Sequence, residues 1–199
     1  MRFSFLSPVY NSEQWVRSML DSIPKEYADE IIVCDDGSTD QTLVMLKEYQ
    51  QQYPQLKILE NGENRGASYS YNRCIEAATG DYIAIIDSDD IYLPTIREVL
   101  AKIDGEYDIY YYSMVTKDGQ LFQATEENYR EWCGQFRIIK RSCVGEARFS
   151  ERPDMAGDCD FHQALLDQNP SVHITGIIAY WYNYPRINSE YYLYYFGLK

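Results

Sequence analysis

The chain is poor in basic residues for its size. Its 199 residues contain 18 Lys and Arg against 31 Asp and Glu, which gives a formal net charge of -13. A basic surface attracts the phosphates of nucleic acids and of anionic lipids, so this balance argues against non-specific binding to either. No apolar run approaches the ~20 residues that a transmembrane helix needs. The sequence therefore predicts no transmembrane segment and no nucleic-acid partner. Peripheral membrane contact stays open through the aromatic run at residues 191–199.

Closely spaced cysteines are missing as well. The five cysteines are scattered, without the spacing of a zinc knuckle or a dithiol redox motif; they are Cys34, Cys74, Cys133, Cys143 and Cys159. Scattered thiols are typical of proteins in the reducing cytosol. Residues 1–8 are typical of a strand and too short for a signal peptide. We expect a cytoplasmic protein, with any peripheral contact at the inner face of the membrane.

Two apolar runs each end in a cluster of carboxylates. Residues 30–34 lead into Asp35 and Asp36, and residues 81–86 lead into an acidic turn at 87–90. Each run predicts a buried strand, and ligands bind outside the carboxyl ends of the strands in an open parallel sheet. Carboxylates crowded at one edge repel each other unless a cation lies among them. The pattern predicts a crevice that holds Mn²⁺ or Mg²⁺ together with a diphosphate.

The first hundred residues alternate between strand and helix patterns. Strands are expected over 2–7, 30–34, 57–60 and 82–86, and helices over 13–22, 41–53, 67–78 and 95–103. Asn11 and Ser38 each precede a glutamine by three residues, the spacing of a capping box at the start of a helix. Alternation of this kind predicts an α/β fold, in which helices cover both faces of a mostly parallel, Rossmann-like sheet.

After residue 105 the pattern is less regular. Strands are expected over 107–115, 121–124, 135–140 and 176–184, a hairpin turn over 117–120, and helices over 126–132 and 158–167. This predicts a small antiparallel region beside the parallel sheet. Because no linker is visible, we expect one domain over 1–199. Its first half, 1–105, would bind a nucleotide, and its second half, 106–199, would face the acceptor.

Four motifs occur in a telling order and spacing. They are PVYN at 8–11, DDGSTD at 35–40, NRG at 64–66 and GDYIAIIDSDD at 80–90. Together they resemble the family 2 glycosyltransferases of the GT-A fold, and residues 132–142, 148–149 and 157–161 resemble that family more loosely. The resemblance implies transfer of a sugar, with inversion, from a nucleoside diphosphate donor, most simply a UDP-sugar. The acceptor would be a hydroxyl of a saccharide or a lipid-linked saccharide, as in the synthesis of polysaccharides and cell-surface glycans.

The resemblance also implies which residues bind the nucleotide. The loop after the first strand, with Pro8, Tyr10 and Asn11, would border the base and the ribose. Asp36 matches the carboxylate that accepts a hydrogen bond from the imide N–H of uracil or thymine. Asn64 and Gly66, the two outer residues of the third motif, would also bind the nucleotide.

Asp87 and Asp89 match the family's Asp-x-Asp motif, which implies a site for Mn²⁺ or Mg²⁺ shared with the diphosphate. Asp89 is expected to bind the metal directly, and Asp87 to contact the ribose or a metal-bound water. Asp158 matches the general base that deprotonates the acceptor hydroxyl. Asp160 is its rival through a shift in the alignment. As alternatives, the acidic turn could be merely solvated, and Asp158 could be a helix N-cap.

One departure from the family concerns the helix after residues 64–66. Many members have an arginine that reaches the diphosphate where this chain has Tyr71. Arg65 or Arg73 would have to substitute for it, and Arg186 is a further candidate near the C-terminus. The departure supports an alternative, a catalytically degenerate relative that binds a nucleotide or sugar without turnover. A nucleotidyltransferase would need a glycine-rich basic loop after the first strand, which residues 8–11 do not resemble.

Overall fold

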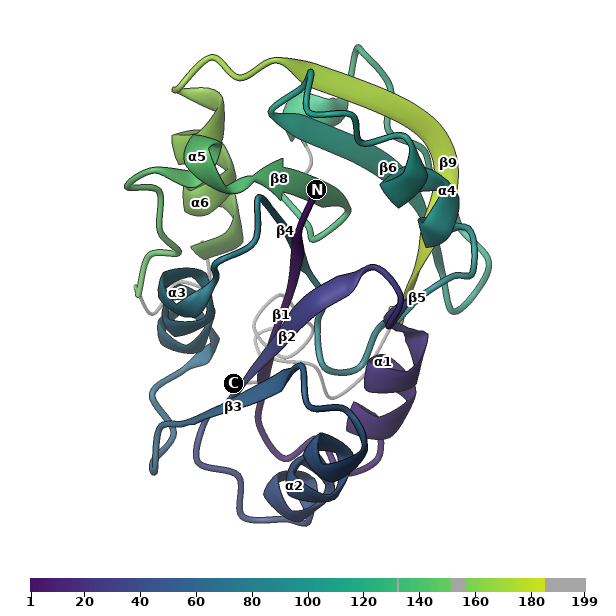
Figure 1. The fold of residues 1–199 in the computed structure, drawn as a ribbon. Coiled ribbons are helices and arrows are strands. Elements are labelled where there is room, and N and C mark those ends of the chain that lie inside the picture. Colours follow the sequence, from purple (N-terminus) through teal and green to yellow (C-terminus); the bar gives the residue numbers. More distant parts are fainter. Residues whose placement is uncertain (132, 152–156, 185–199) are drawn as a thin grey trace.

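The structure is a computed structural model that describes residues 1–131, 133–151 and 157–184 (Figure 1). The strands are β1 (Phe3–Val9), β2 (Ala28–Asp35), β3 (Leu56–Glu60), β4 (Tyr82–Ile85), β5 (Ile91–Tyr92), β6 (Ile109–Thr116), β7 (Leu121–Phe122), β8 (Arg137–Lys140) and β9 (Val172–Tyr182). The helices are α1 (Val16–Ser22), α2 (Thr42–Gln52), α3 (Ala67–Ala77), α4 (Ile96–Ala101), α5 (Arg141–Val144) and α6 (Gly157–Leu166), with a 3₁₀ turn at Tyr129–Glu131.

Strands from both halves of the chain share one sheet, which curls so that β6 and β9 cross above the parallel strands (Figure 1). Within the described residues the strand order is β3-β2-β1-β4-β8-β6-β9-β5, and β7 pairs with β6. β1 is parallel to β2 and β4, and β2 is parallel to β3. β8 runs antiparallel to β4 and β6. The predicted parallel sheet with an antiparallel region is therefore confirmed.

Helices cover both faces of the parallel strands: α1 and α2 lie on one side, and α3 and α6 on the other (Figure 1). The buried residues of α3 include Tyr71, Cys74 and Ile75. Their spacing of three and four places them on one face of the helix, and this face packs on β1 and β2. Among the described residues no helix is both long and apolar enough to cross a membrane.

The capping boxes predicted at Asn11 and Ser38 are wrong. α1 begins after Trp15 and α2 after Gln41, and neither helix has a side-chain hydrogen bond at its N-cap. The two loops instead bind each other. The Asn11 backbone N–H donates to Ser38 Oγ at 3.0 Å, and the backbone N–H of Thr39 donates to Asn11 Oδ1 at 2.8 Å. The polar side chains satisfy backbone groups in the neighbouring loop, because the parallel pairing of β1 and β2 brings both loops to one edge.

The second half departs from the sequence prediction where elements are short. α5 is not predicted at all, nor is β5 near the end of the first half, and the helix expected over 126–132 is only the 3₁₀ turn at Tyr129–Glu131. β9 is longer at its start than predicted, and it pairs with β6 in parallel and with β5 in antiparallel orientation. It therefore joins the end of the sheet to the segment that follows β4.

The opposite edge of the sheet, at the start of the strands, is held by Glu30. This buried carboxylate accepts hydrogen bonds from Ser4 Oγ at 2.6 Å and from the Thr79 backbone N–H at 2.6 Å, and it pairs with Lys57. Burial alone would raise the pKa of Glu30, but the bonds from Lys57, Ser4 and Thr79 lower that pKa to about 2. Glu30 is therefore ionised at neutral pH and joins β1, β2 and β3 to the turn before β4.

Candidate functional site

The acidic turn after β4 is anchored through Asp90. Asp90 is buried and accepts hydrogen bonds from the Tyr180 hydroxyl at 2.7 Å and from the Asn183 backbone N–H at 2.8 Å. The same Tyr180 oxygen accepts the backbone N–H of Asp87 at 3.2 Å. Tyr180 of β9 and Asn183 just after it therefore hold the turn in place, and Asp87 and Asp89 remain partly exposed.

Asp87 and Asp89 each accept a hydrogen bond from a neutral side chain. The Tyr71 hydroxyl donates to Asp87 Oδ1, and Asn183 Nδ2 donates to Asp89 Oδ2 at 3.3 Å. Burial raises the pKa of Asp90 well above its usual range, and the charges of Asp87 and Asp89 raise it further. The turn thus concentrates negative charge that a cation would relieve.

A divalent cation at this turn would need ligands from its substrate. In the described part of the chain, no three His, Cys, Asp or Glu side chains cluster closely enough to hold a metal ion by themselves. Mg²⁺ is commonly bound by one or two carboxylates together with substrate phosphates, and Mn²⁺ also favours oxygen ligands. Two partly exposed carboxylates in a crowded acidic turn fit that requirement, with the diphosphate supplying the remaining oxygens.

Asp36 organises the loop that follows β3. Its carboxylate accepts hydrogen bonds from Asn61 Nδ2 at 2.5 Å, from the Arg65 backbone N–H at 3.0 Å and from the Gly66 backbone N–H at 2.8 Å. Gly66 has φ +92°, which an L side chain rarely adopts, and it directly precedes α3. The structure thus gives Asp36 a clear loop-forming role, and its contact with a nucleobase stays a prediction.

The other predicted nucleotide-binding residues lie along the same edge. Pro8 is part of β1 and pairs with Cys34 near the end of β2, Tyr10 is exposed, and Asn11 bridges to the loop after β2. Asn64 is exposed in the loop that Asp36 holds. Parallel pairing of β1, β2 and β3 brings these loops together at their carboxyl ends.

The arginines that could replace the missing one lie in different places. Arg73 donates from Nη1 to the Glu60 carbonyl at 3.0 Å and to Asn61 Oδ1 at 2.5 Å, so it binds the end of β3. The guanidinium of Arg65 lies 3.6 Å from the centre of the Tyr69 ring. Arg65 is exposed and stays a predicted diphosphate contact, whereas Arg186 lies outside the described residues.

Asp158 lies in the first turn of α6, beside two side chains from the antiparallel region. Gln135 Nε2 donates to Asp158 Oδ1 at 3.1 Å. Burial raises the pKa of Asp158 to about 6, while nearby Arg137 and the Gln135 bond act to lower it. A carboxylate with a pKa near 6 is mostly ionised at pH 7 and basic enough to accept a proton.

The structure separates Asp158 from its rival. Asp160, two residues further along α6, accepts a hydrogen bond from Ser150 Oγ and belongs to a different face of the helix. Asp158 instead lies near the acidic turn. Burial raises the pKa of Tyr71 well above its usual range, and the charges of Asp87 and Asp158 both raise it further. Asp158 therefore shares its surroundings with the predicted metal site.

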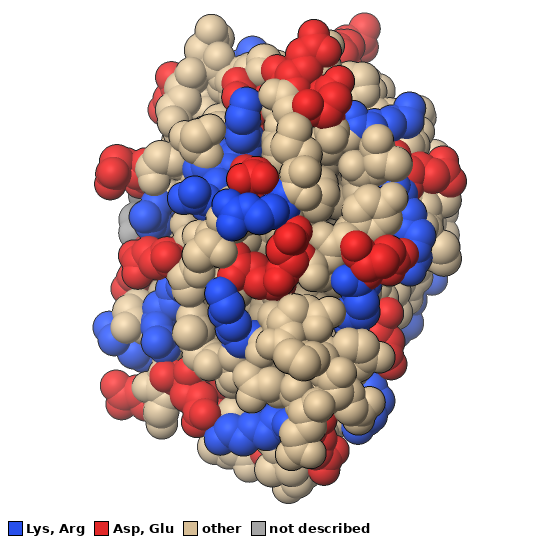
Figure 2. Space-filling model, viewed as in Figure 1, with Lys and Arg blue, Asp and Glu red and all other residues tan. Residues whose placement is uncertain are grey.

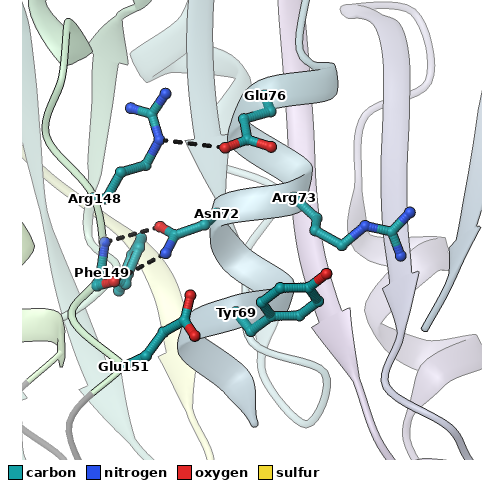
Figure 3. A pocket seen from close by; sticks show the side chains of 7 residues that line it. All are labelled: Tyr69, Asn72, Arg73, Glu76, Arg148, Phe149 and Glu151. Carbon is teal, nitrogen blue, oxygen red and sulfur yellow. Dashed lines mark hydrogen bonds and ion pairs between the residues drawn. The ribbon is translucent and has the colours of Figure 1, made fainter. Parts of the chain in front are cut away.

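A surface hollow lies beside α3 (Figure 3). It has a volume of about 520 Å³ and is lined by Tyr69, Asn72, Arg73, Glu76, Arg148, Phe149 and Glu151. It opens on the outer side of α3, whereas the Tyr71 side of the helix faces the acidic turn. The predicted carboxylates do not line it. Figure 2 shows Lys and Arg interspersed with Asp and Glu on the face it displays, without a field of one sign.

Several residues of the site were missed by sequence reasoning. Tyr180 and Asn183 come from the apolar run at 176–184, and Gln135 and Arg137 from the run at 135–140, both predicted only as extended strands. Their places depend on how β8 and β9 join the sheet, which local patterns do not reveal. Asp90 was visible in the acidic cluster, and its position next to Asp89 was the only signal.

Comparison with known proteins identifies the family. The family model described as "Glycosyl transferase family 2" matches residues 4–166. The chain therefore belongs to glycosyl transferase family 2, which confirms the predicted relationship. The glycosyltransferase YibD of Escherichia coli (strain K12) is 38% identical over 110 residues, which cover 54% of this chain and 32% of YibD. The chain thus spans about a third of the length of this relative.

Solved structures share the fold. S. aureus TarS in complex with UDP-GlcNAc superposes with a TM-score of 0.82 at 23% identity, covering 94% of this chain and 59% of that chain. The mannosyltransferase PcManGT from Pyrobaculum calidifontis, in complex with GDP-Man and Mn²⁺, superposes with a TM-score of 0.72 at 19% identity, covering 94% and 58%. The predicted GT-A fold class is confirmed.

Proposed function

We propose that the chain is an inverting glycosyltransferase that takes a sugar from a nucleoside diphosphate donor, preferably a UDP-sugar. The observation that supports this most is that two sets of carboxylates lie near each other around Tyr71. The acidic turn with Asp87 and Asp89 lies near Asp158, whose pKa of about 6 suits a general base. The structure of TarS with UDP-GlcNAc supports a UDP-sugar as the donor.

The residues divide the work as follows. The nucleotide would lie along the loops that carry Tyr10, Asn11 and Asp36, and its diphosphate would reach the acidic turn. Asp87 and Asp89 would hold Mn²⁺ or Mg²⁺, which would stabilise the negative charge of the leaving diphosphate. The mannosyltransferase structure with GDP-Man and Mn²⁺ supports a divalent cation in this fold.

Asp158 would accept the proton of the acceptor hydroxyl. The acceptor oxygen forms its bond to the anomeric carbon on the face opposite the diphosphate, and the bond from that carbon to the phosphate oxygen breaks. The released nucleoside diphosphate keeps the electron pair of the broken bond, and attack on the opposite face inverts the configuration of the anomeric carbon. Gln135 would hold the Asp158 carboxylate in one orientation during this step.

The acceptor and the cellular setting follow from the family rather than from the site. We propose a saccharide or lipid-linked saccharide acceptor, a role in polysaccharide or cell-surface glycan synthesis, and a cytoplasmic location with peripheral membrane contact. The two halves of the chain, 1–105 and 106–199, would serve the donor and the acceptor respectively.

A donor screen tests the proposal. The protein is incubated with UDP-, GDP- and dTDP-sugars, with Mn²⁺, with Mg²⁺ or with EDTA, and release of the nucleoside diphosphate is measured. We expect release from UDP-sugars that requires the metal and is lost in Asp158→Asn. Tight nucleotide binding without release from any donor would favour the degenerate binding protein instead, and no binding of any nucleotide would refute the proposal.

A further inference from the structure

Tyr71 occupies a place on α3 from which its side chain reaches the acidic turn. It is buried, and its hydroxyl donates a hydrogen bond to Asp87 Oδ1. The hydroxyl therefore fixes one oxygen of a carboxylate that faces the proposed donor. Because a hydrogen bond to an ionised group is about twice as strong as one between neutral groups, this contact restricts the Asp87 carboxylate to one orientation.

The Tyr71 ring is itself immobilised by a stack of aromatic rings. It stacks on Phe149 with centroids 4.3 Å apart and planes 15° apart, and Phe149 stacks on Phe161 of α6 at 4.3 Å and 16°. Asn72 exchanges two 2.9 Å hydrogen bonds with the backbone of Phe149 (Figure 3). The phenol is thus held in place before any ligand arrives.

The stack also connects the two functional parts of the site. Phe161 lies three residues after Asp158 on α6, so the two side chains occupy neighbouring positions on the helix surface. A rigid path therefore runs from the α6 turn that bears Asp158, through Phe161 and Phe149, to Tyr71 and Asp87. This arrangement connects the acidic turn to the helix turn that bears the proposed base.

We propose that Tyr71 is a positioning residue that presets the Asp87 carboxylate for the divalent cation bound with the donor diphosphate. This inference rests on the proposed function. A neutral phenol brings no positive charge to the diphosphate, unlike an arginine at this place. The metal must then neutralise more of the diphosphate charge. We therefore expect metal binding to be the step most sensitive to the loss of the Tyr71 hydroxyl.

The test is Tyr71→Phe, which keeps the aromatic stack and removes only the hydroxyl. UDP binding is measured by calorimetry over a series of Mn²⁺ concentrations, and kcat for donor hydrolysis is measured over the same series. We expect the Mn²⁺ concentration for half-maximal UDP binding to rise about tenfold, the effect of losing one hydrogen bond to a charged group. At saturating Mn²⁺, kcat should return close to the wild-type value.

Tyr49→Phe is the matched control. Tyr49 on α2 is also a buried tyrosine whose hydroxyl donates to a carboxylate, Asp21 Oδ1 at 2.7 Å, but it lies away from the acidic turn. Its removal should leave the Mn²⁺ dependence unchanged.

Three outcomes would overturn the inference. If Tyr71→Phe keeps the wild-type Mn²⁺ dependence while the wild type binds UDP with the metal, the inference fails and the proposed function stands. If the variant loses binding and kcat equally at every Mn²⁺ concentration, Tyr71 has only a structural role. If the wild-type protein binds UDP independently of metal, the inference fails together with the metal site of the proposed function.

Discussion

The hydrogen bond from Gln135 to Asp158 should set the pH dependence of the proposed reaction. Gln135 is buried, and its amide donates to Asp158 Oδ1 at 3.1 Å. A general base must be ionised, so kcat should rise with pH along the ionisation of Asp158, whose pKa is about 6. Gln135→Leu keeps a similar volume but removes a donor that favours the ionised form, so the pKa of Asp158 should move upward.

The size of the shift follows from one hydrogen bond. A bond to a charged group contributes roughly 1.5 kcal/mol, which corresponds to about one pKa unit. A base with a pKa near 6 is about three-quarters ionised at pH 6.5, and one with a pKa near 7 about one-quarter. The variant should therefore be about threefold slower at pH 6.5 and should match the wild type at about pH 8.5.

The assay is release of UDP from the donor at saturating Mg²⁺, recorded from pH 5 to 8.5. Gln163→Leu is the control, because Gln163 makes a similar bond on the same helix, to Asp167 Oδ1 at 2.7 Å, away from the acidic turn. Its profile should coincide with that of the wild type. If Gln135→Leu lowered the rate by the same factor at every pH, or left the pH profile of the rate unshifted, this bond would have no role in setting the pKa of Asp158.

Four further substitutions separate the proposed roles. Asp89→Asn should abolish turnover and weaken UDP binding in the presence of Mn²⁺, and the assignment is wrong if calorimetry shows that UDP binding by the wild type is insensitive to EDTA. Asp36→Asn should weaken UDP binding more than ADP binding. It should also lower Tm, because it disturbs the three hydrogen bonds that hold the loop after β3. Equal weakening for both nucleotides would leave Asp36 only its loop-forming role. Asp158→Asn should lower kcat by a factor of ~10² to 10⁴ while UDP still binds, and Asp160→Asn should keep substantial activity, since Asp160 is bonded to Ser150; the reverse pattern in steady-state kinetics would move the base to Asp160.

The parallel part of the fold was predictable because its signals are local. The buried strands that end at Asp35 and before Asp87 are continuous apolar runs, and α3 shows the three- and four-residue spacing of a helix that packs on a sheet. The starts of α1 and α2 were predicted too early, because Asn11 and Ser38 form hydrogen bonds with each other's loops and do not cap the helices.

The partners of the site residues were not predictable, because they depend on contacts between distant segments. Tyr180 and Asn183 reach the acidic turn from about 90 residues away in sequence, through the pairing of β9 with β5. Tyr71 was singled out only because it stands where many family members have an arginine. No local sequence pattern shows that its hydroxyl reaches Asp87. The sequence could place the carboxylates at one edge, and packing decided which neutral side chains hold them.

Glu30 and the proposed base Asp158 take up protons in different pH ranges. Glu30 has a folded-state pKa lowered to about 2, so its contribution to stability is complete above about pH 4.5 and is lost only as the pH falls toward 2. Asp158 takes up its proton near pH 6. Between about pH 4.5 and pH 6 the proposed base is protonated while Glu30 still makes its full contribution to stability. Mild acid should therefore stop the proposed reaction without unfolding the protein. A return to neutral pH should restore the activity without a refolding step.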